Sequence, residues 1–153
     1  MSLQIGKKAP SFNLQDQDGN SVSLDDLSGK TTLIYFYPKD DTPGCTTQAC
    51  SLRDNIDDLR SNGIEVVGVS KDDVESHRKF ATKYNIPFKI LSDPSCKMIE
   101  SYGAWGEKNM YGRKYMGIIR SGALLGPDLK IIAIWPKLQP LNTVSQVQQY
   151  AKF

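Results

Sequence analysis

One stretch of the sequence limits the possible fold more than any other. Residues 31–37, TTLIYFY, are a run of β-branched and aromatic side chains, which is typical of a strand that is covered on both faces. Residues 45–60 then repeat apolar side chains at helical spacing, and SNG at 61–63 supplies a stop signal. A second strand pattern, IEVVGVS at 64–70, follows at once. Because the connections are short, this order predicts two parallel strands joined by a right-handed crossover.

The remaining patterns fit the same α/β layer architecture. Residues 11–24, SFNLQDQDGNSVSL, alternate around a turn at Asp18 and Gly19, which predicts an N-terminal β-hairpin. Residues 72–85 predict a second helix that ends before Pro87. Further along, we expect a short strand at 89–93, a short helix at 95–103, a hairpin at 117–136 that turns at Gly126, Pro127 and Asp128, and an amphipathic helix at 141–153 capped by Asn142 or Thr143.

Composition narrows the class of protein. The chain has 153 residues, 39% hydrophobic content and a net charge of +2, which suits one domain over residues 1–153 and gives no sign of nucleic-acid binding. We expect no membrane segment, since no apolar run reaches about 18 residues and the N-terminus does not resemble a secretion signal. The three cysteines do not form a secreted disulfide pattern. We therefore expect a cytoplasmic protein whose thiols are catalytic, redox-active or simply buried.

The loop after the predicted strand at residues 31–37 contains the best candidates for reactive side chains. It lies at the carboxyl end of that strand, where functional crevices of open α/β sheets are found. Pro38 and Pro43 stiffen the loop, and Gly44 permits a close backbone approach where the helix begins. Cys45 falls in the first helical turn, where unpaired N–H groups and the helix dipole favour a thiolate over a thiol. The alternative is that Cys45 is only a small residue at a helix start.

Thr42 precedes Cys45 by three residues. Its hydroxyl can point toward the same anion site, although a threonine before a helix is by default an N-cap or turn residue. Pro38, Thr42 and Cys45 together spell P-x-x-x-T-x-x-C, which resembles the active-site signature of the peroxiredoxin family. The longer segment FYPKDDTPGCTTQACSLRD resembles the bacterioferritin-comigratory, or Q-type, group. So do GKKAPSFNLQDQDG, ILSDPSCKMIESYGAWGEK and YGRKYMGIIR, in order, and the resemblance covers nearly the whole chain.

This resemblance implies a thioredoxin-like fold, with a central mixed β-sheet flanked by helices, and a thiol peroxidase that reduces hydrogen peroxide and organic hydroperoxides. It assigns Cys45 as the peroxidatic cysteine, Thr42 as a hydroxyl partner of the peroxide, Pro38 as the shield of the thiolate and Arg120 as the distant arginine. These roles agree with the chemistry, because cleavage of an O–O bond needs a thiolate, a donor and positive charge. A surface arginine on an edge strand is the alternative for Arg120.

One departure from the family pattern touches Arg120. Relatives usually carry a serine or threonine and an aromatic residue after the arginine, whereas this chain reads RSGALL, with Gly122 and Ala123. The side chains that pack around Arg120 are therefore expected to differ from those of the relatives.

Attack on a peroxide leaves a sulfenic acid, which condenses with a nearby thiol. The resemblance allows Cys50 as this resolving cysteine. In an ideal helix, residues five apart have Cα atoms about 8.6 Å apart, whereas a disulfide tolerates at most about 7 Å. We therefore expect the first turns of the helix to unwind during turnover, unless Cys50 is only part of the apolar stripe. Cys96 has three open interpretations: a buried small residue, an alternative resolving thiol or a bystander.

No organic or metal cofactor is implied, because sulfur supplies the chemistry. A zinc site built from Cys45, Cys50, Cys96 and His77 lacks paired ligand spacing, and His77 is expected on the solvent-exposed side of a helix. The resemblance implies thioredoxin or a thioredoxin-like reductant, and we expect a monomer or weak homodimer.

Two other functions are alternatives to a peroxidase. The first is a non-enzymatic redox sensor or holdase, and the second is a thiol–disulfide oxidoreductase, which would normally carry C-x-x-C. Trp105 and Tyr111 are expected at the pocket mouth or in the core.

Overall fold

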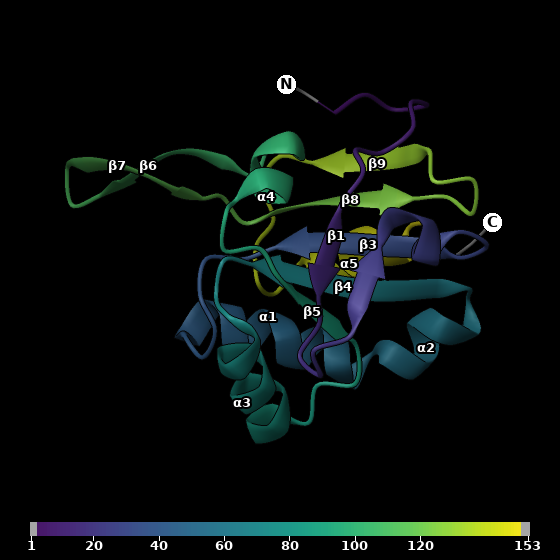
Figure 1. Ribbon diagram of the computed structural model, residues 1–153, viewed down its shortest axis with the longest axis horizontal. Helices are drawn as coiled ribbons and strands as arrows, with labels where there is room; N and C mark the ends of the chain where they lie inside the picture. The colour runs from purple at the N-terminus through teal and green to yellow at the C-terminus, as the bar shows by residue number, and fades with distance from the viewer. Residues whose placement is uncertain (1–2, 151–153) are drawn as a thin grey trace.

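Strand β3 (Thr31–Phe36) lies inside a seven-stranded mixed sheet in a computed structural model that describes residues 3–150 (Figure 1). The strand order is β2-β1-β5-β4-β3-β8-β9, and β6 and β7 form a separate two-stranded sheet. The other strands are β1 (Asn13–Gln15), β2 (Ser21–Ser23), β4 (Ile64–Ser70), β5 (Lys89–Ser92), β6 (Trp105–Met110), β7 (Arg113–Ile118), β8 (Ser121–Leu125) and β9 (Ile131–Trp135). The helices are η1 (Leu24–Leu27), α1 (Pro43–Asp54), α2 (Ile56–Ser61), α3 (Val74–Tyr84), α4 (Lys97–Ser101) and α5 (Thr143–Gln148). The expected central mixed sheet flanked by helices is confirmed.

The predicted parallel crossover is present, but its helix is broken. Strands β3 and β4 pair in parallel over their whole shared length. The single helix expected over residues 45–60 is wrong, because Asn55 leaves the helical conformation (φ −112°, ψ 8°) and separates α1 from α2. The Asn55 side-chain amide donates to the Ser51 carbonyl at 2.8 Å. Such local side-chain bonding competes with the backbone bonds that continue a helix.

Alternate residues of β3 enter two different cores. Leu33 and Tyr35 belong to a cluster that includes buried side chains of α1, α2, α3 and α5, whereas Ile34 and Phe36 belong to a cluster that includes residues of η1 and α4. Both sets are almost fully buried. This arrangement explains why the strand reads as a continuous apolar run, since neither face meets water.

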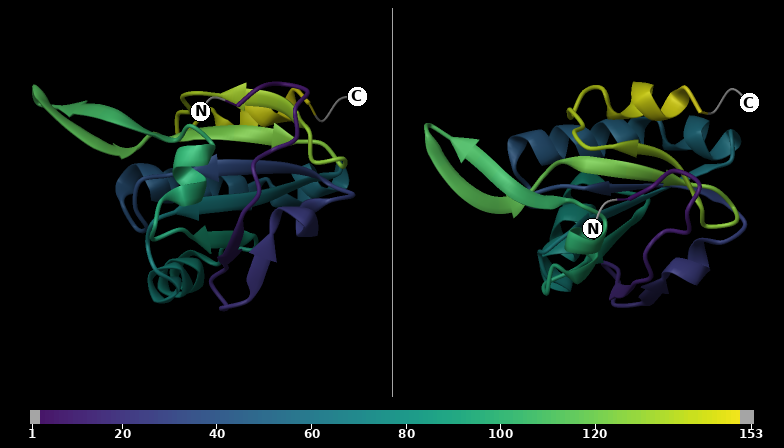
Figure 2. Two further views of the ribbon diagram at one scale, coloured as in Figure 1. Left: turned by 45° about the horizontal axis from the view of Figure 1, so that its top comes forward. Right: turned by 90° about the horizontal axis from the view of Figure 1, so that it is seen from above.

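Three β-hairpins are present among the described residues, two within the seven-stranded sheet and one outside it. The predicted β1–β2 hairpin and the predicted β8–β9 hairpin are confirmed. The β6–β7 hairpin was not predicted from sequence, and it projects away from the sheet in all three ribbon views (Figures 1 and 2). Its turn is formed by Tyr111 and Gly112, both with positive φ. Tyr111 is 101% exposed at this tip, so the expectation that it borders a pocket or fills the core is wrong.

The ends of the helices follow the sequence signals. Asp73 caps α3 by accepting from the Ser76 backbone N–H at 2.8 Å, and Asn85 ends this helix with φ 53°. Asn142 occupies the N-cap position of α5, and residues 151–153 of the predicted terminal helix lie outside the described part of the chain. Within residues 3–150, no helix is both long and apolar enough to cross a membrane.

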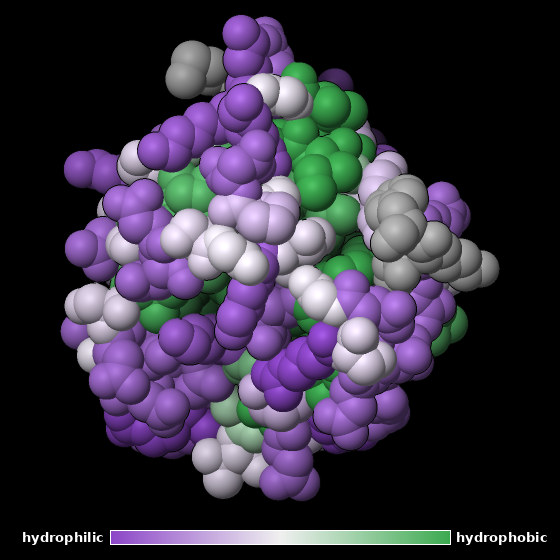
Figure 3. Space-filling view, turned by 90° about the vertical axis from the view of Figure 1, so that its right-hand side faces the viewer, coloured by the Kyte–Doolittle hydropathy of each residue, from purple (hydrophilic) through white to green (hydrophobic). Residues whose placement is uncertain are grey.

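A polar cavity of about 470 Å³ lies at the end of the sheet where β3 begins, and charged residues such as Lys30, Arg60 and Glu65 line it. Figure 3 views the molecule from the side opposite the projecting hairpin and shows mainly hydrophilic residues, with a hydrophobic area in its upper part. Cys45 follows the other end of β3. The thiol and this cavity are therefore at opposite ends of the central strand.

Candidate active site

The loop between β3 and α1 presents Cys45 as the third residue of the helix. Pro43 begins α1, as expected for a residue without an N–H, and Thr42 precedes it with extended backbone (φ −99°, ψ 155°). The first intrahelical bond runs from the Thr46 N–H to the Thr42 carbonyl at 2.8 Å. Cys45 is 2% exposed. Its sulfur thus lies in the first turn of a helix and away from bulk water, where a negative charge is stabilised by the helix dipole.

Arg120 brings a fixed positive charge to this sulfur. It lies between β7 and β8, 75 residues away in sequence, and its Nη2 donates to Cys45 Sγ at 3.5 Å. A Cβ atom on Gly44 would lie 3.0 Å from Nη2. Glycine at position 44 therefore makes room for the guanidinium against the start of α1. The two residues that the sequence predicted to cooperate, Cys45 and Arg120, are in contact.

Gln48 orients the other side of the guanidinium, and sequence reasoning missed it. Arg120 Nη1 donates to Gln48 Oε1 at 2.7 Å, and Gln48 Nε2 donates to Thr143 Oγ1 at 2.9 Å. Thr143 in turn donates to the Gln139 carbonyl at 2.8 Å. Gln48 and Thr143 are fully buried. This series of hydrogen bonds therefore connects the Arg120 guanidinium to α5 and fixes its position. The sequence spacing could have identified Gln48, because it is three residues after Cys45 and lies on the same face of the helix.

The departure at Gly122 and Ala123 is accommodated by packing. A Cβ atom on Gly122 would lie 3.0 Å from Leu138 Cδ1 and 3.1 Å from the Ile34 carbonyl oxygen. Ala123 is fully buried on the opposite face of β8. The Leu138 backbone N–H donates to the Arg120 carbonyl at 2.8 Å. Leu138 therefore occupies the space that a larger residue 122 would need, and it holds the Arg120 backbone at the same time.

Lys108 adds a second cation near the site. It extends from β6, is partly buried, and donates from Nζ to the Ile118 carbonyl at 2.8 Å. Burial, followed by repulsion from Arg120, lowers the pKa of Lys108, while the charge of Cys45 acts in the opposite direction. Lys108 could not be found from sequence, because the hairpin that carries it was not predicted.

Thr42 is the last residue of the loop between β3 and α1, and Pro38 lies near its start. The Thr42 hydroxyl donates to the Lys39 carbonyl at 2.8 Å and makes no capping bond to the helix. Its proton is thus used within the loop, while its oxygen remains an acceptor. Pro38 is partly buried and lies two residues after Phe36, the last residue of β3. Beneath the loop, burial first and then the charge of Cys45 raise the pKa of Tyr35, which keeps this phenol neutral.

The three cysteines are all free thiols, and they are not equivalent. Cys45 and Cys50 both lie within α1, so ideal helical geometry separates their Cα atoms by about 8.6 Å. Cys50 is partly buried. Cys96 occupies the N-cap position of α4 with φ 62° and packs against the core cluster on the other face of the sheet from Cys45.

Cys96 is expected to react slowly with alkylating agents. Burial, followed by the charge of Asp93, raises the pKa of the Cys96 thiol, and only the thiolate is nucleophilic. In a variant that retains Cys96 alone, with Cys45 and Cys50 changed to serine, the rate of iodoacetamide labelling should be below that of free cysteine at about pH 7. It should still be rising above about pH 9, beyond the ordinary thiol pKa. A labelling rate that levels off below about pH 8.5 would contradict this assignment.

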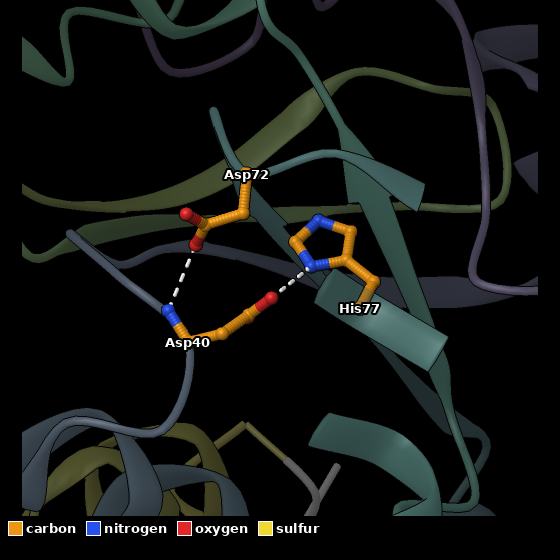
Figure 4. Close-up of side chains that lie close together, drawn as sticks. All are labelled: Asp40, Asp72 and His77. Carbon is orange, nitrogen blue, oxygen red and sulfur yellow. Dashed lines mark hydrogen bonds and ion pairs between the residues drawn. The ribbon is translucent and has the colours of Figure 1, made fainter. Parts of the chain in front are cut away.

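His77 is fully buried, so the expectation of a solvent-exposed histidine is wrong. Its Nδ1 lies 2.6 Å from Asp40 Oδ2 (Figure 4). Its Nε2 lies 2.9 Å from the Leu91 carbonyl oxygen. Within the described residues, His77, Asp40 and Asp72 form the group whose potential metal-ligand atoms lie within 4.8 Å of one another. None of the cysteines belongs to this group. The four residues considered for zinc are therefore not assembled into one site.

Comparison with known proteins gives a consistent result. The model of a family described as AhpC/TSA matches residues 5–134. The chain is 43% identical over 150 residues to peroxiredoxin Bcp of Escherichia coli strain K12, which covers 98% of this chain and 96% of the relative. It is 40% identical over 152 residues to peroxiredoxin Bcp of Bacillus subtilis strain 168, with 99% and 97% covered.

Solved structures agree with the sequence relatives. Peroxiredoxin Q of Xanthomonas campestris superimposes with a TM-score of 0.86 at 33% identity, covering 92% of this chain and 89% of the other. A cysteine-to-serine mutant of PrxQ from Xylella fastidiosa gives a TM-score of 0.88 at 26% identity, with 98% of each chain covered. The expected thioredoxin-like peroxiredoxin fold is confirmed. By sequence, by fold and by the matched family model, the chain belongs to the AhpC/TSA family of peroxiredoxins.

Proposed function

We propose that Cys45 is the peroxidatic residue of this thiol peroxidase. Its thiolate attacks one peroxide oxygen, the O–O bond breaks, and the leaving oxygen takes up a proton to give water or an alcohol. Cys45 becomes a sulfenic acid, so sulfur supplies the two electrons. The observation that carries this proposal is the contact between the buried Cys45 sulfur, in the first turn of α1, and the Arg120 guanidinium at 3.5 Å.

Arg120, Thr42 and Pro38 assist this step in the proposed mechanism. The Arg120 guanidinium stabilises the thiolate and then the negative charge that develops on the departing oxygen. The Thr42 oxygen lies in the turn before Cys45 and can accept a hydrogen bond from a protonated peroxide. Pro38 limits water access to the loop, because its side chain is partly buried where β3 ends.

Cys50 resolves the sulfenic acid in the second proposed step. Its thiol attacks the Cys45 sulfur, a disulfide forms and one water molecule leaves. Since both residues lie in α1, the first turns of this helix must unwind before the two sulfur atoms can bond. Cys96 takes no part, because it packs against the core on the other face of the sheet.

A dithiol protein then restores the enzyme by thiol exchange. We infer that thioredoxin or a thioredoxin-like protein supplies these electrons, and that the chain works as one domain, as a monomer or weak homodimer, in the cytoplasm. Organic hydroperoxides are proposed as substrates beside hydrogen peroxide. Support comes from a Xanthomonas campestris bacterioferritin comigratory protein whose structures concern alkyl peroxide reduction, at 33% identity and a TM-score of 0.86.

Peptide mapping and a Cys50→Ser variant test this mechanism. After one equivalent of hydrogen peroxide, non-reducing digestion of the wild-type protein should give a Cys45–Cys50 cross-linked peptide. The Cys50→Ser variant should consume one equivalent of peroxide and then stop turning over with thioredoxin and its reductase. Sustained turnover by this variant at the wild-type rate would remove Cys50 from the mechanism. A disulfide oxidoreductase role is not favoured, since four residues separate the two cysteines.

A further inference from the structure

A buried polar cluster attaches the loop before Cys45 to helix α3. Asp40 lies in the middle of this loop and is buried. Its carboxylate accepts hydrogen bonds from the Tyr37 hydroxyl at 2.5 Å and from the Ser76 hydroxyl at 2.7 Å. His77 Nδ1 lies 2.6 Å from the same carboxylate. One loop residue therefore contacts two successive residues of α3, and the contact with the fully buried His77 lies away from water, which strengthens it.

The bonds of His77 define where its protons lie. The Leu91 carbonyl oxygen can only accept, so Nε2 carries the hydrogen in the 2.9 Å contact with it. The 2.6 Å contact between Nδ1 and Asp40 Oδ2 is the second hydrogen bond of the ring. Burial, followed by the Asp40 charge, raises the pKa of Tyr37 well above its ordinary value, which keeps that hydroxyl a donor to Asp40. The cluster is thus fully hydrogen-bonded around Asp40.

The next residue extends the attachment to the surface. The Asp40 backbone N–H donates to Asp72 Oδ2 at 2.8 Å (Figure 4). Asp41 has φ 57°, and its carboxylate accepts from Lys83 Nζ at 2.8 Å and from the Tyr84 hydroxyl at 2.7 Å. Residues 40 and 41 are therefore held by side chains of α3 and by Asp72, which lies two residues before this helix.

We propose that His77 and Asp40 are positioning residues that hold the loop where α1 must start when Cys45 reacts with peroxide. Pro43, the first residue of α1, follows Asp40 by only three residues. Ordering a loop costs conformational entropy. The hydrogen bonds of the buried pair offset this cost in the folded protein, so the loop is already ordered when the substrate binds. The pair therefore favours the wound form of α1 over the unwound form that Cys50 requires. This inference rests on the proposed roles of Cys45 and Cys50.

Loosening the pair should affect two steps of the cycle differently. Peroxide reduction needs the wound form and should become slower. Disulfide formation needs the unwound form and should become faster or stay unchanged. A second peroxide molecule competes with Cys50 by oxidising the sulfenic acid to a sulfinic acid, with release of water. Over-oxidation of Cys45 should therefore decrease in a variant that unwinds more readily.

The test uses His77→Gln and His77→Asn in the full chain, with Arg78→Ala as a control at an exposed ion pair of the same helix. Stopped-flow fluorescence gives the rate constant for oxidation by hydrogen peroxide and the rate constant for disulfide formation. Mass spectrometry gives the sulfinic fraction. In His77→Gln, the oxidation rate constant should fall about ten- to a hundredfold, without a fall in the disulfide rate constant. His77→Asn, whose amide lies near the Nδ1 position, should recover part of this loss.

Equal decreases in both rate constants, or no decrease in the oxidation rate constant, would overturn the proposal. If the His77 variants do not fold, Ser76→Ala removes one donor to Asp40 and should give a smaller change in the same direction. Failure of the underlying mechanism is distinguishable, because wild-type protein would then form no Cys45–Cys50 disulfide. In that case the oxidation rate constant and the sulfinic fraction still decide the role of His77.

Discussion

Replacement of Cys45 by serine is expected to reduce peroxide consumption by at least about 10³-fold, to the rate of the uncatalysed reaction. A serine hydroxyl is not ionised at neutral pH and does not attack an O–O bond as a thiolate does. The helix start and Arg120 would remain, so the loss would report the sulfur itself. The measurement is hydrogen peroxide consumption coupled to thioredoxin and its reductase.

Cys96→Ser is the matched control for this experiment. The residue lies on the other face of the sheet, and serine retains its size. This variant should keep wild-type activity within about twofold, the scatter expected of a substitution away from the site. If Cys45→Ser consumed peroxide as fast as Cys96→Ser, the assignment of Cys45 would be wrong.

Replacement of Arg120 by methionine should lower kcat/KM for hydrogen peroxide by about 10²- to 10³-fold, as expected when one donor to a developing negative charge is removed. Methionine retains much of the aliphatic length but neither the charge nor the donors. Burying Gln48 Oε1 without its 2.7 Å partner should also cost about 1–3 kcal/mol of unfolding free energy. Steady-state kinetics and urea denaturation measure the two effects separately.

Arg120→Lys separates charge from geometry in the same experiment. Lysine retains one positive charge but cannot contact Cys45 and Gln48 with the two arms of a fork. It should recover only part of kcat/KM. A methionine variant with kcat/KM within about twofold of wild type would show that Arg120 is not needed for the reaction.

Local patterns predicted the elements whose side chains repeat with a clear period. The continuous run in β3 and the alternation around Gly19 reflect burial on two faces and on one face, respectively. The position of Cys45 followed from its neighbours, because Pro43 is favoured at the first position of a helix and does begin α1. The break at Asn55 was not predicted, since the apolar repeat continues across it through Ile56.

Contacts between distant segments could not be predicted in this way. His77 has the polar neighbours Ser76 and Arg78, so the sequence around it is typical of an exposed helix surface. Its burial depends on Asp40, which is 37 residues away and belongs to a loop. The β6–β7 hairpin likewise lacks a period-2 pattern, because most of its side chains are exposed on both faces. Lys108 was missed for this reason.

The break at Asn55 limits how far a structural change in the proposed cycle can spread. Helix melting is cooperative along a continuous run of backbone hydrogen bonds, and that run is interrupted between α1 and α2. Melting that starts at Cys45 can therefore stop before α2, whose Leu59 is fully buried in the core. Each catalytic cycle would then disorder one helical segment while the rest of the crossover stays folded, so the enzyme could open and close many times without approaching global unfolding.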